Sequence, residues 1–263
     1  MINMDMDHLL FVPFLIFYEL AIPLVMMKII VIYFFEFLYN YKNIVSYYKN
    51  NINGYWEWSK LFIDVAGCKY YLIDGSSDVY IEKTKRCVFL LNHRSVFDFP
   101  SDCYVTRGNS MFIARYLNMY AAPIQGLYTY MTSCVYYFNR LNRPCVSDKK
   151  KFNHAVYSKL MESECQNINI YPEGTRVLTN EIKPIKKGGI HLAWNNKMRI
   201  QIIITRNKEI PFSAKTFKFK YGANLYCYVD KYLDSADYDN FDDFYDAVYK
   251  QWRYSWHKVY CGD

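Results

Sequence analysis

Between residue 68 and the C-terminus, short apolar runs alternate with longer amphipathic stretches. The short runs are rich in β-branched and aromatic residues, which is typical of strands. The amphipathic stretches predict helices over 96–107, 147–165, 188–197 and 239–259. Regular alternation of strands and helices is typical of an α/β domain with a largely parallel sheet. The predicted strands are 69–73, 78–82, 87–91, 110–114, 135–139, 167–171, 200–204, 216–221 and 225–229.

Two turn-rich segments modify this pattern. The segment "DGSSD" at 74–78 predicts the turn of a first hairpin, and "YGAN" at 221–224 predicts the turn of a last one. Asp148 is in position to cap the helix predicted at 147–165. We therefore expect a central, mostly parallel mixed β-sheet that is flanked by helices.

The N-terminal segment has a different character. Residues 9–39 are nearly all apolar, although Glu19, Lys28 and Glu36 interrupt them and two prolines divide them. No charge-free stretch approaches the roughly 18–20 residues of a confident spanning helix. The segment is either a buried helix pair or a membrane-embedded helical hairpin or tilted anchor. We favour the membrane interpretation, because the rest of the chain already has its own core-forming segments.

The stretch that follows, residues 41–60, is basic and rich in Tyr and Trp. Such a composition suits the headgroup layer on the cytosolic side of a membrane. We therefore divide the chain into residues 1–67, a membrane-anchoring helical segment with a basic aromatic linker, and residues 68–263, a catalytic domain. The acidic start "MINMDMD" does not resemble a signal peptide.

Charge and cysteine content narrow the possible partners. A net charge of +7 favours anionic partners such as a membrane surface or phosphates. Nucleic acid is not expected, because the charges are dispersed and no standard binding motif is present. The eight cysteines show no C-x-x-C spacing, so we expect reduced structural thiols and no metal site.

The segment "NHRSVFD" at 92–98 contains the first candidate chemistry. His93 and Asp98 would lie on different faces of one helix. They can pair only if His93 precedes the helix and Asp98 lies in its first turns. Asp98 would then fix the imidazole tautomer and leave the other ring nitrogen as a base. Taken alone, the spacing also fits a surface histidine beside a helix-start aspartate.

A second motif, "YPEGTR" at 171–176, directly follows a predicted strand. Pro172 ends the strand, and Gly174 allows the backbone to approach a ligand closely. Glu173 and Arg176 project from the loop that follows. In a parallel sheet, ligands bind at such strand ends.

Together the two motifs resemble the first and third sequence blocks of the glycerolipid acyltransferases, the 1-acylglycerol-3-phosphate and lysophospholipid acyltransferase family. The tracts "NHRS" and "KPIKKG" are similar to its eukaryotic-type branch. The second block matches "YYFNR" at 136–140, with Phe138 and Arg140 in place, and the fourth corresponds to "IQIIITRN" at 200–207. The chain departs from the family pattern at Asn139, Val177 and Arg206, among other positions. These departures leave the choice of acceptor open.

The resemblance implies transfer of a fatty acyl group from acyl-CoA to a free hydroxyl of a lysophospholipid, first of all lysophosphatidic acid. His93 would be the base, and Asp98 would orient it. Main-chain amides, including those near Gly174, would stabilise the oxyanion. Acyl-CoA is a co-substrate, and no cofactor, metal or acyl-serine on Ser95 is expected. The residues implied for the acceptor and its phosphate are Arg140, Glu173, Gly174, Thr175 and Arg176, and those for acyl-CoA are Lys186 and Lys187.

We expect a location at the cytosolic face of a membrane, which would be endoplasmic-reticulum-like or virus-associated if the source is eukaryotic or viral, as the resemblance to the eukaryotic-type branch implies. Several alternatives remain open. The acceptor is alternatively glycerol-3-phosphate or a lysophospholipid with a larger head. The chain is alternatively an inactive lipid-binding membrane protein. A serine hydrolase is disfavoured, because no G-x-S-x-G elbow is present. Chain-length preference would depend on a tunnel lined by Phe, Tyr and Met residues of 111–138.

Overall fold

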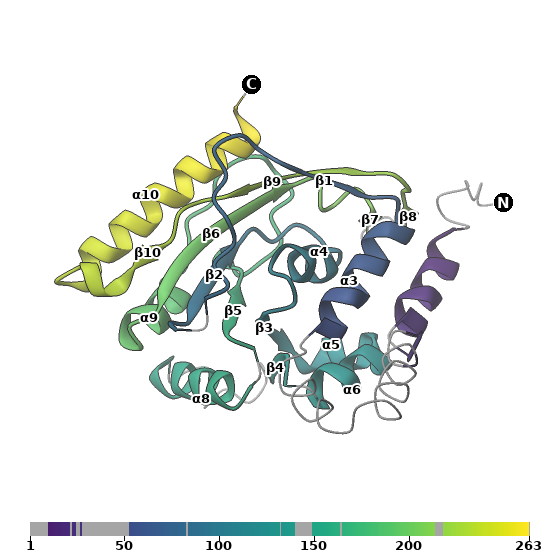
Figure 1. The fold of residues 1–263 in the computed structure, drawn as a ribbon, viewed down its shortest axis with the longest axis horizontal. Coiled ribbons are helices and arrows are strands. Elements are labelled where there is room, and N and C mark those ends of the chain that lie inside the picture. Colours follow the sequence, from purple (N-terminus) through teal and green to yellow (C-terminus); the bar gives the residue numbers. More distant parts are fainter. Residues whose placement is uncertain are drawn as a thin grey trace, which may run out of the picture.

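The computed structural model describes most of the chain from residue 53 onwards and one N-terminal helix (Figure 1). The described residues are 10–21, 23–24, 27, 53–82, 84–131, 133–139, 149–163, 165–213 and 218–262.

One large mixed sheet organises the molecule. It runs in the order β1-β9-β6-β2-β5-β3-β4, and β10 pairs with β6 at the side. The pairs from β6 to β4 are parallel, whereas β6 pairs antiparallel with β9 and β10. The expected mostly parallel mixed sheet is thereby confirmed. The bounds are β1 Lys69–Leu72, β2 Cys87–Leu91, β3 Ser110–Arg115, β4 Val135–Phe138, β5 Asn167–Ile170, β6 Arg199–Arg206, β9 Asn224–Val229 and β10 Leu233–Asp234, with a separate pair β7 Phe212–Ser213 and β8 Lys218–Phe219.

Helices cover the sheet on both sides. In Figure 1, α10 lies along one side of the sheet, and α3 lies beside the N-terminal helix at the other end. Asn240 caps α10 by accepting a hydrogen bond from the Asp243 N–H at 2.9 Å. The helices are α3 Asn53–Val65, α4 Asp98–Val105, α5 Tyr116–Ala121, α6 Pro123–Met131, α8 Lys149–Glu162, α9 Gly188–Asn195 and α10 Phe241–Tyr260, with a 3₁₀ turn, η1, at Ser235–Asp237.

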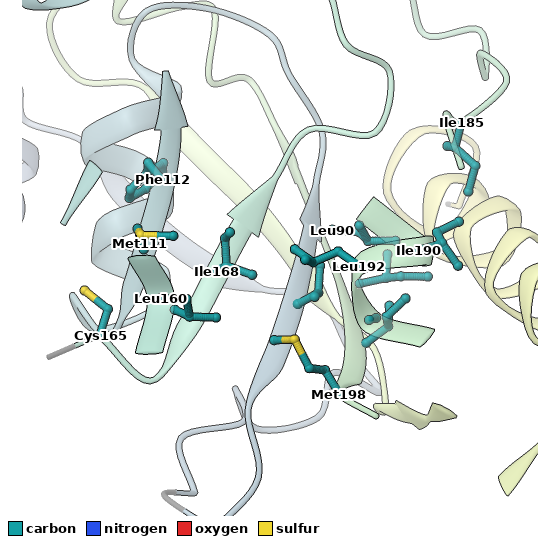
Figure 2. Packing of buried hydrophobic residues seen from close by; sticks show 14 of the residues in the cluster. Leu90, Met111, Phe112, Leu160, Cys165, Ile168, Ile185, Ile190, Leu192 and Met198 are labelled. Carbon is teal, nitrogen blue, oxygen red and sulfur yellow. The ribbon is translucent and has the colours of Figure 1, made fainter. Parts of the chain in front are cut away.

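The central strand β2 explains why the strand runs are continuously apolar. All five of its residues are buried, because the sheet is covered on both faces. Val88 and Leu90 pack towards α9 and α10, whereas Phe89 and Leu91 belong to the cluster on the opposite face. Figure 2 shows Leu90 beside Ile190 and Leu192 of α9. The core therefore fixes β2, the strand from which the first motif emerges.

Both predicted hairpins are wrong. Residues 78–82 form no strand, and the Tyr80 N–H donates to the Gln201 side chain at 2.8 Å instead. β1 pairs with β9 in parallel, far along the chain. The segment at 221–224 separates β8 from β9, but β8 pairs with β7. The turn-forming residues of both segments thus indicate where the chain changes direction, but they do not decide which strands pair. The expected cap at Asp148 lies outside the described residues.

The N-terminal segment is described only in part. Residues 10–21 form a helix whose Phe14 side chain contacts the ring of Phe62 on α3, with 4.7 Å between ring centroids. Trp58 of α3 is 1% exposed, so this tryptophan lies in the core and not at a headgroup layer. No helix among the described residues has the length and hydropathy to cross a membrane. The embedded hairpin and the domain boundary after residue 67 stay predictions, and most of residues 22–52 lies outside the described part.

Candidate active site

The carboxyl ends of three neighbouring parallel strands, β6, β2 and β5, meet at one edge of the sheet. The loop after β2 carries His93, the loop after β5 carries Tyr171 and Glu173, and the loop after β6 carries Lys208. Ligands of parallel sheets bind at this edge, because strand-end loops and helix starts converge there. The fold therefore brings the two sequence motifs into one site.

His93 and Asp98 form a hydrogen-bonded pair. Nδ1 of His93 lies 2.6 Å from Oδ2 of Asp98. His93 lies in the loop before α4 and Asp98 is the first residue of that helix, as the sequence argument required. The side chain of His93 is 25% exposed and that of Asp98 only 2%, so a substrate can reach the imidazole but not the carboxylate. With Nδ1–H donating to Asp98, Nε2 keeps a lone pair that can accept a proton.

The Asp98 carboxylate is held from several sides. Its Oδ2 atom also accepts the main-chain N–H groups of Arg94 at 2.6 Å and Ser95 at 3.1 Å. Burial alone would raise the pKa of Asp98, but the Lys208 ammonium and the hydrogen bond from His93 lower it below its ordinary value. Asp98 is therefore an ionised, rigid acceptor that can stabilise an imidazolium beside it.

Glu173 lies behind His93 and not in the open. Its Oε2 atom accepts the main-chain N–H of His93 at 3.0 Å, and its Oε1 atom is buried without a hydrogen-bond partner in the structure. Burial raises the pKa of Glu173 to about 8, although the His93 N–H and the charge of Lys208 act in the opposite direction. Near neutral pH the carboxyl is therefore mostly protonated and can donate one hydrogen bond.

Three further residues, none of them a predicted site residue, lie behind the pair. The Tyr171 ring stacks on the His93 imidazole, with 4.4 Å between centroids and 16° between planes. The Tyr171 hydroxyl donates to Asp102 Oδ2 at 2.8 Å. Asp102 in turn accepts from the fully buried Lys208 at 2.9 Å. The available signal was the four-residue spacing of Asp98 and Asp102, which places both carboxylates on one face of α4.

Arg94 ties the surrounding loops together. Its guanidinium donates to both oxygens of Glu209, from Nε at 3.1 Å and from Nη2 at 2.5 Å. Nη1 donates to the Thr179 carbonyl at 2.7 Å. The Val177 N–H also donates to the His93 carbonyl, at 2.8 Å. These bonds fix the loops after β2, β5 and β6 against one another, which limits movement of the pair.

The Ser95 hydroxyl is engaged within the protein. It donates to the Lys208 carbonyl at 2.8 Å and accepts the Phe97 N–H at 2.9 Å. Ser95 is also buried. This geometry suits a structural hydroxyl at the start of α4 and leaves His93 as the reactive side chain of the motif.

The glycine of the second motif has a special backbone conformation. Gly174 has a φ of +71°, and its N–H donates to the Tyr171 carbonyl at 3.0 Å. That amide is therefore occupied and does not face a developing oxyanion. A Cβ at Gly174 would lie 2.1 Å from Nζ of Lys186, so the Lys186 ammonium lies directly against this turn.

The remaining predicted binding residues divide between two places. Arg176 is exposed and lines both the main pocket and a second hollow beside Glu173 and Thr175. Lys187 instead faces α10, where its Nζ lies 4.4 Å from the ring centroid of Tyr245. Arg140 lies outside the described residues, so its predicted role stays a prediction.

A largely apolar pocket opens at His93. Its volume is about 340 Å³, within the range of small-molecule sites. It extends between β3, β4, α6 and the N-terminal helix. Phe112 and Tyr137, two of the aromatic residues in the range predicted for the tunnel, lie in its wall, and none of the described lining residues is a methionine. Smaller residues and the N-terminal helix also contribute, through Leu15, Tyr18, Ala114 and Gly126.

Comparison with known proteins identifies the family of the chain. Residues 75–205, about half of the chain, match the family model Acyltransferase. The matched span contains both motifs and the paired histidine and aspartate. The chain belongs to this acyltransferase family.

Curated relatives of this acyltransferase carry a common activity in their names. The chain is 28% identical over 153 residues to the 1-acyl-sn-glycerol-3-phosphate acyltransferase of Saccharomyces cerevisiae, covering 54% of this chain and 45% of the relative. It is 29% identical over 142 residues to the human 1-acyl-sn-glycerol-3-phosphate acyltransferase beta, covering 54% of this chain and 49% of that protein. The acyltransferase therefore spans about half the length of these relatives.

A solved structure supports the fold. The crystal structure of the 1-acyl-sn-glycerophosphate (LPA) acyltransferase PlsC from Thermotoga maritima superimposes with a TM-score of 0.58 and 13% sequence identity. The match covers 90% of this chain and 94% of that one. At this identity the likeness concerns the arrangement of the sheet and helices.

Proposed function

We propose that this acyltransferase moves a fatty acyl chain from acyl-CoA to the free hydroxyl of lysophosphatidic acid, giving phosphatidic acid. The observation that carries the proposal is the His93–Asp98 pair, with 2.6 Å between Nδ1 and Oδ2, at the mouth of an apolar pocket. A base at the end of an apolar pocket suits transfer of a long chain to a hydroxyl. The names of the yeast and human relatives support the choice of acceptor.

The first chemical step is attack by the acceptor hydroxyl. Nε2 of His93 takes the hydroxyl proton while the oxygen forms a bond to the thioester carbonyl carbon. The ring then carries a positive charge, which the buried Asp98 carboxylate stabilises through the Nδ1–H bond. The stacked Tyr171 ring limits rotation of the imidazole, so Nε2 remains directed to the pocket.

The second step releases coenzyme A. The tetrahedral oxyanion collapses, the carbon–sulfur bond breaks, and the His93 proton passes to the leaving thiolate. The products are the ester and free coenzyme A, and the base returns to its starting state. No covalent acyl-enzyme is required, in agreement with the engaged hydroxyl of Ser95.

The surroundings of His93 offer separate places for the two ends of the substrates. Arg176 borders both hollows and can bind the acceptor phosphate bidentately. Lys186 lies against the same turn and adds positive charge for the phosphates of acyl-CoA. The apolar pocket would hold the transferred acyl chain.

Membrane association is part of the proposal. The N-terminal helix points Phe14 and Ala21 inwards but leaves Val12 57% and Ile16 54% exposed. An outward apolar face of this kind suits contact with a lipid surface. Because Leu15 of the same helix lines the pocket, deleting the helix would damage the site as well. A cleaner test is Val12→Glu/Ile16→Glu, which we expect to lose liposome flotation while activity on detergent-dispersed substrate remains.

The decisive experiment is acyl transfer by the purified full chain in detergent. Labelled oleoyl-CoA is offered with lysophosphatidic acid, glycerol-3-phosphate and lysophosphatidylcholine in parallel. His93→Ala is compared with His154→Ala, a matched change at an exposed histidine on α8. We expect labelled phosphatidic acid from the wild type and from His154→Ala, and none from His93→Ala.

Other outcomes change the proposal in defined ways. Product with a different acceptor would keep the reaction and replace lysophosphatidic acid as the substrate. No product with any acceptor, from a folded protein that binds acyl-CoA, would favour a lipid-binding role.

A further inference from the structure

Two buried carboxylates lie one turn apart on α4. Asp98 is 1% exposed and Asp102 is fully buried. Two like charges in such a position oppose each other, and burying them without a cation is costly. The pair therefore requires a positive charge from another part of the fold, and the described structure supplies one.

Lys208 provides this charge from the loop after β6. Its Nζ atom donates to Asp102 Oδ1 at 2.9 Å and Oδ2 at 3.0 Å, and to the Asn92 carbonyl at 2.6 Å. Nζ also lies 3.6 Å from Asp98 Oδ1, an oxygen that has no hydrogen-bond partner in the structure. Lys208 itself is fully buried. The ammonium thus stands between both carboxylates, and its hydrogen bonds hold it in place.

A second connection reaches His93 through Tyr171. The Tyr171 hydroxyl donates to Asp102, and its ring stacks on the imidazole. The Lys208 Nζ atom lies 5.9 Å from the centroid of the same ring. Lys208 and Asp102 thereby support both Asp98, the hydrogen-bond partner of His93, and the ring that stacks on the His93 imidazole.

We propose that Lys208 is a positioning residue, which keeps Asp98 ionised and directed at His93 and, through Asp102 and Tyr171, holds the imidazole plane. This role deepens the proposed function and rests on it for its kinetic test. The competing explanation is that Lys208 only neutralises Asp102 and stabilises the fold.

A charge-balanced set of variants separates these explanations. Lys208→Met removes the ammonium and keeps a long apolar chain. Asp102→Asn/Lys208→Met removes this hydrogen-bonded pair together, so that neither Asp102 nor Lys208 remains as a charge without the other, whereas Asp98 loses its cation. If Lys208 only neutralised Asp102, the double variant would recover both stability and activity. If Lys208 acts on Asp98, stability returns and activity does not.

We expect the double variant to unfold near the wild-type temperature. Its kcat should fall about tenfold or more, which is part of the contribution of a general base, and its KM should change little. Relative to Asp102→Asn, which retains Lys208, the acidic limb of its pH–rate profile should lie at higher pH, because the two variants differ only in the cation beside Asp98, and loss of that cation favours the protonated imidazole. The charged or titratable groups that face Lys208 among the described residues are Asp98, Asp102, Tyr171, Glu173, Cys227 and Tyr260. A double variant with wild-type kcat and pH profile overturns the proposal.

A spectroscopic test does not depend on turnover. In protein with isotope-labelled histidine, the Nδ1–H proton shared with Asp98 gives a resonance that His93→Gln identifies. We expect it to shift or disappear in the double variant and to persist in Asp102→Asn, which retains Lys208. If the variants show these spectra but the wild-type protein acylates no acceptor, the role of Lys208 stands and the proposed function is wrong. An unchanged resonance in the double variant would remove the positioning role.

Discussion

Glu173 Oε2 accepts the main-chain N–H of His93 at 3.0 Å, so a side chain of the second motif supports the backbone of the first. The role predicted for Glu173 was to bind the acceptor. The described contacts place it behind His93, bonded to the main chain, where burial has the largest effect on the pKa of its carboxyl group. A buried carboxyl that takes up a proton on folding makes stability depend on pH.

We predict that Glu173→Gln removes a pH dependence of unfolding. The pKa of Glu173 is raised from 4.5 to about 8 in the folded state by burial. The native protein therefore holds a proton that the unfolded chain releases, and the unfolding free energy falls between these pH values, by up to about 1.4 kcal/mol per pH unit. Below pH 4.5 both states are protonated, and this contribution is fully present.

The measurement is urea unfolding of both proteins from about pH 5 to pH 8. Glutamine keeps an oxygen that can accept the His93 N–H. We expect the variant to gain stability relative to the wild type as pH rises. Glu162→Gln, at an exposed glutamate on α8, serves as the control and should show a flat difference. A difference that does not grow with pH would contradict the raised pKa.

A second prediction concerns Asp98. Asp98→Asn keeps the size of the side chain but removes the negative charge that stabilises the imidazolium. We expect kcat to fall about 10²- to 10⁴-fold, the range for a general base, with KM nearly constant because Asp98 does not reach the substrate. Steady-state kinetics with Asp64→Asn, an exposed aspartate on α3, as the matched control would check this. A kcat within about twofold of the wild type would show that the pair does not work as a unit.

A third prediction concerns the acceptor phosphate. Arg176→Ala should raise KM for lysophosphatidic acid about tenfold or more, since a hydrogen bond to a charged group is worth ~1.5–3 kcal/mol. Arg176→Lys should recover part of this loss, because lysine keeps the charge but not the bidentate geometry. KM for monoacylglycerol, which has no phosphate, should not change. An equal rise in KM for both acceptors would show that Arg176 has a structural role and does not bind the phosphate. Arg253→Ala on α10 controls for loss of surface charge.

Most strands of the sheet and the pairing of His93 with Asp98 were predictable because their signals are local. The apolar run of β2 and the next loop predicted a buried strand that ends at His93, and the structure has both. The tertiary contacts were not predictable in this way. Lys208 reaches Asp102 from more than a hundred residues away, and no local pattern distinguishes it from a surface lysine. Only the two carboxylates on one face of α4 indicated that a cation was needed.

In the region between β3 and β4, local structure itself was missed. No helix was predicted there, yet α5 and α6 form and supply part of the pocket wall. The basic aromatic stretch at 41–60 was interpreted as a headgroup layer, but Trp58 packs in the core. Composition alone does not separate an aromatic residue at a membrane from one in a core, since both environments remove it from water.

The last prediction concerns which chain the pocket holds. Ala114 on β3 lines it, so Ala114→Leu fills part of the space that a long acyl chain would use. Each excluded methylene should cost ~0.8 kcal/mol, or about fourfold in kcat/KM. We therefore expect the ratio of kcat/KM for oleoyl-CoA over lauroyl-CoA to fall at least tenfold, with lysophosphatidic acid held constant. Ala236→Leu, an exposed alanine in η1, should leave the ratio unchanged. If the ratio stays constant but the preferred chain length of the lysophosphatidic acid changes, the pocket holds the acceptor chain, and the transferred chain lies elsewhere.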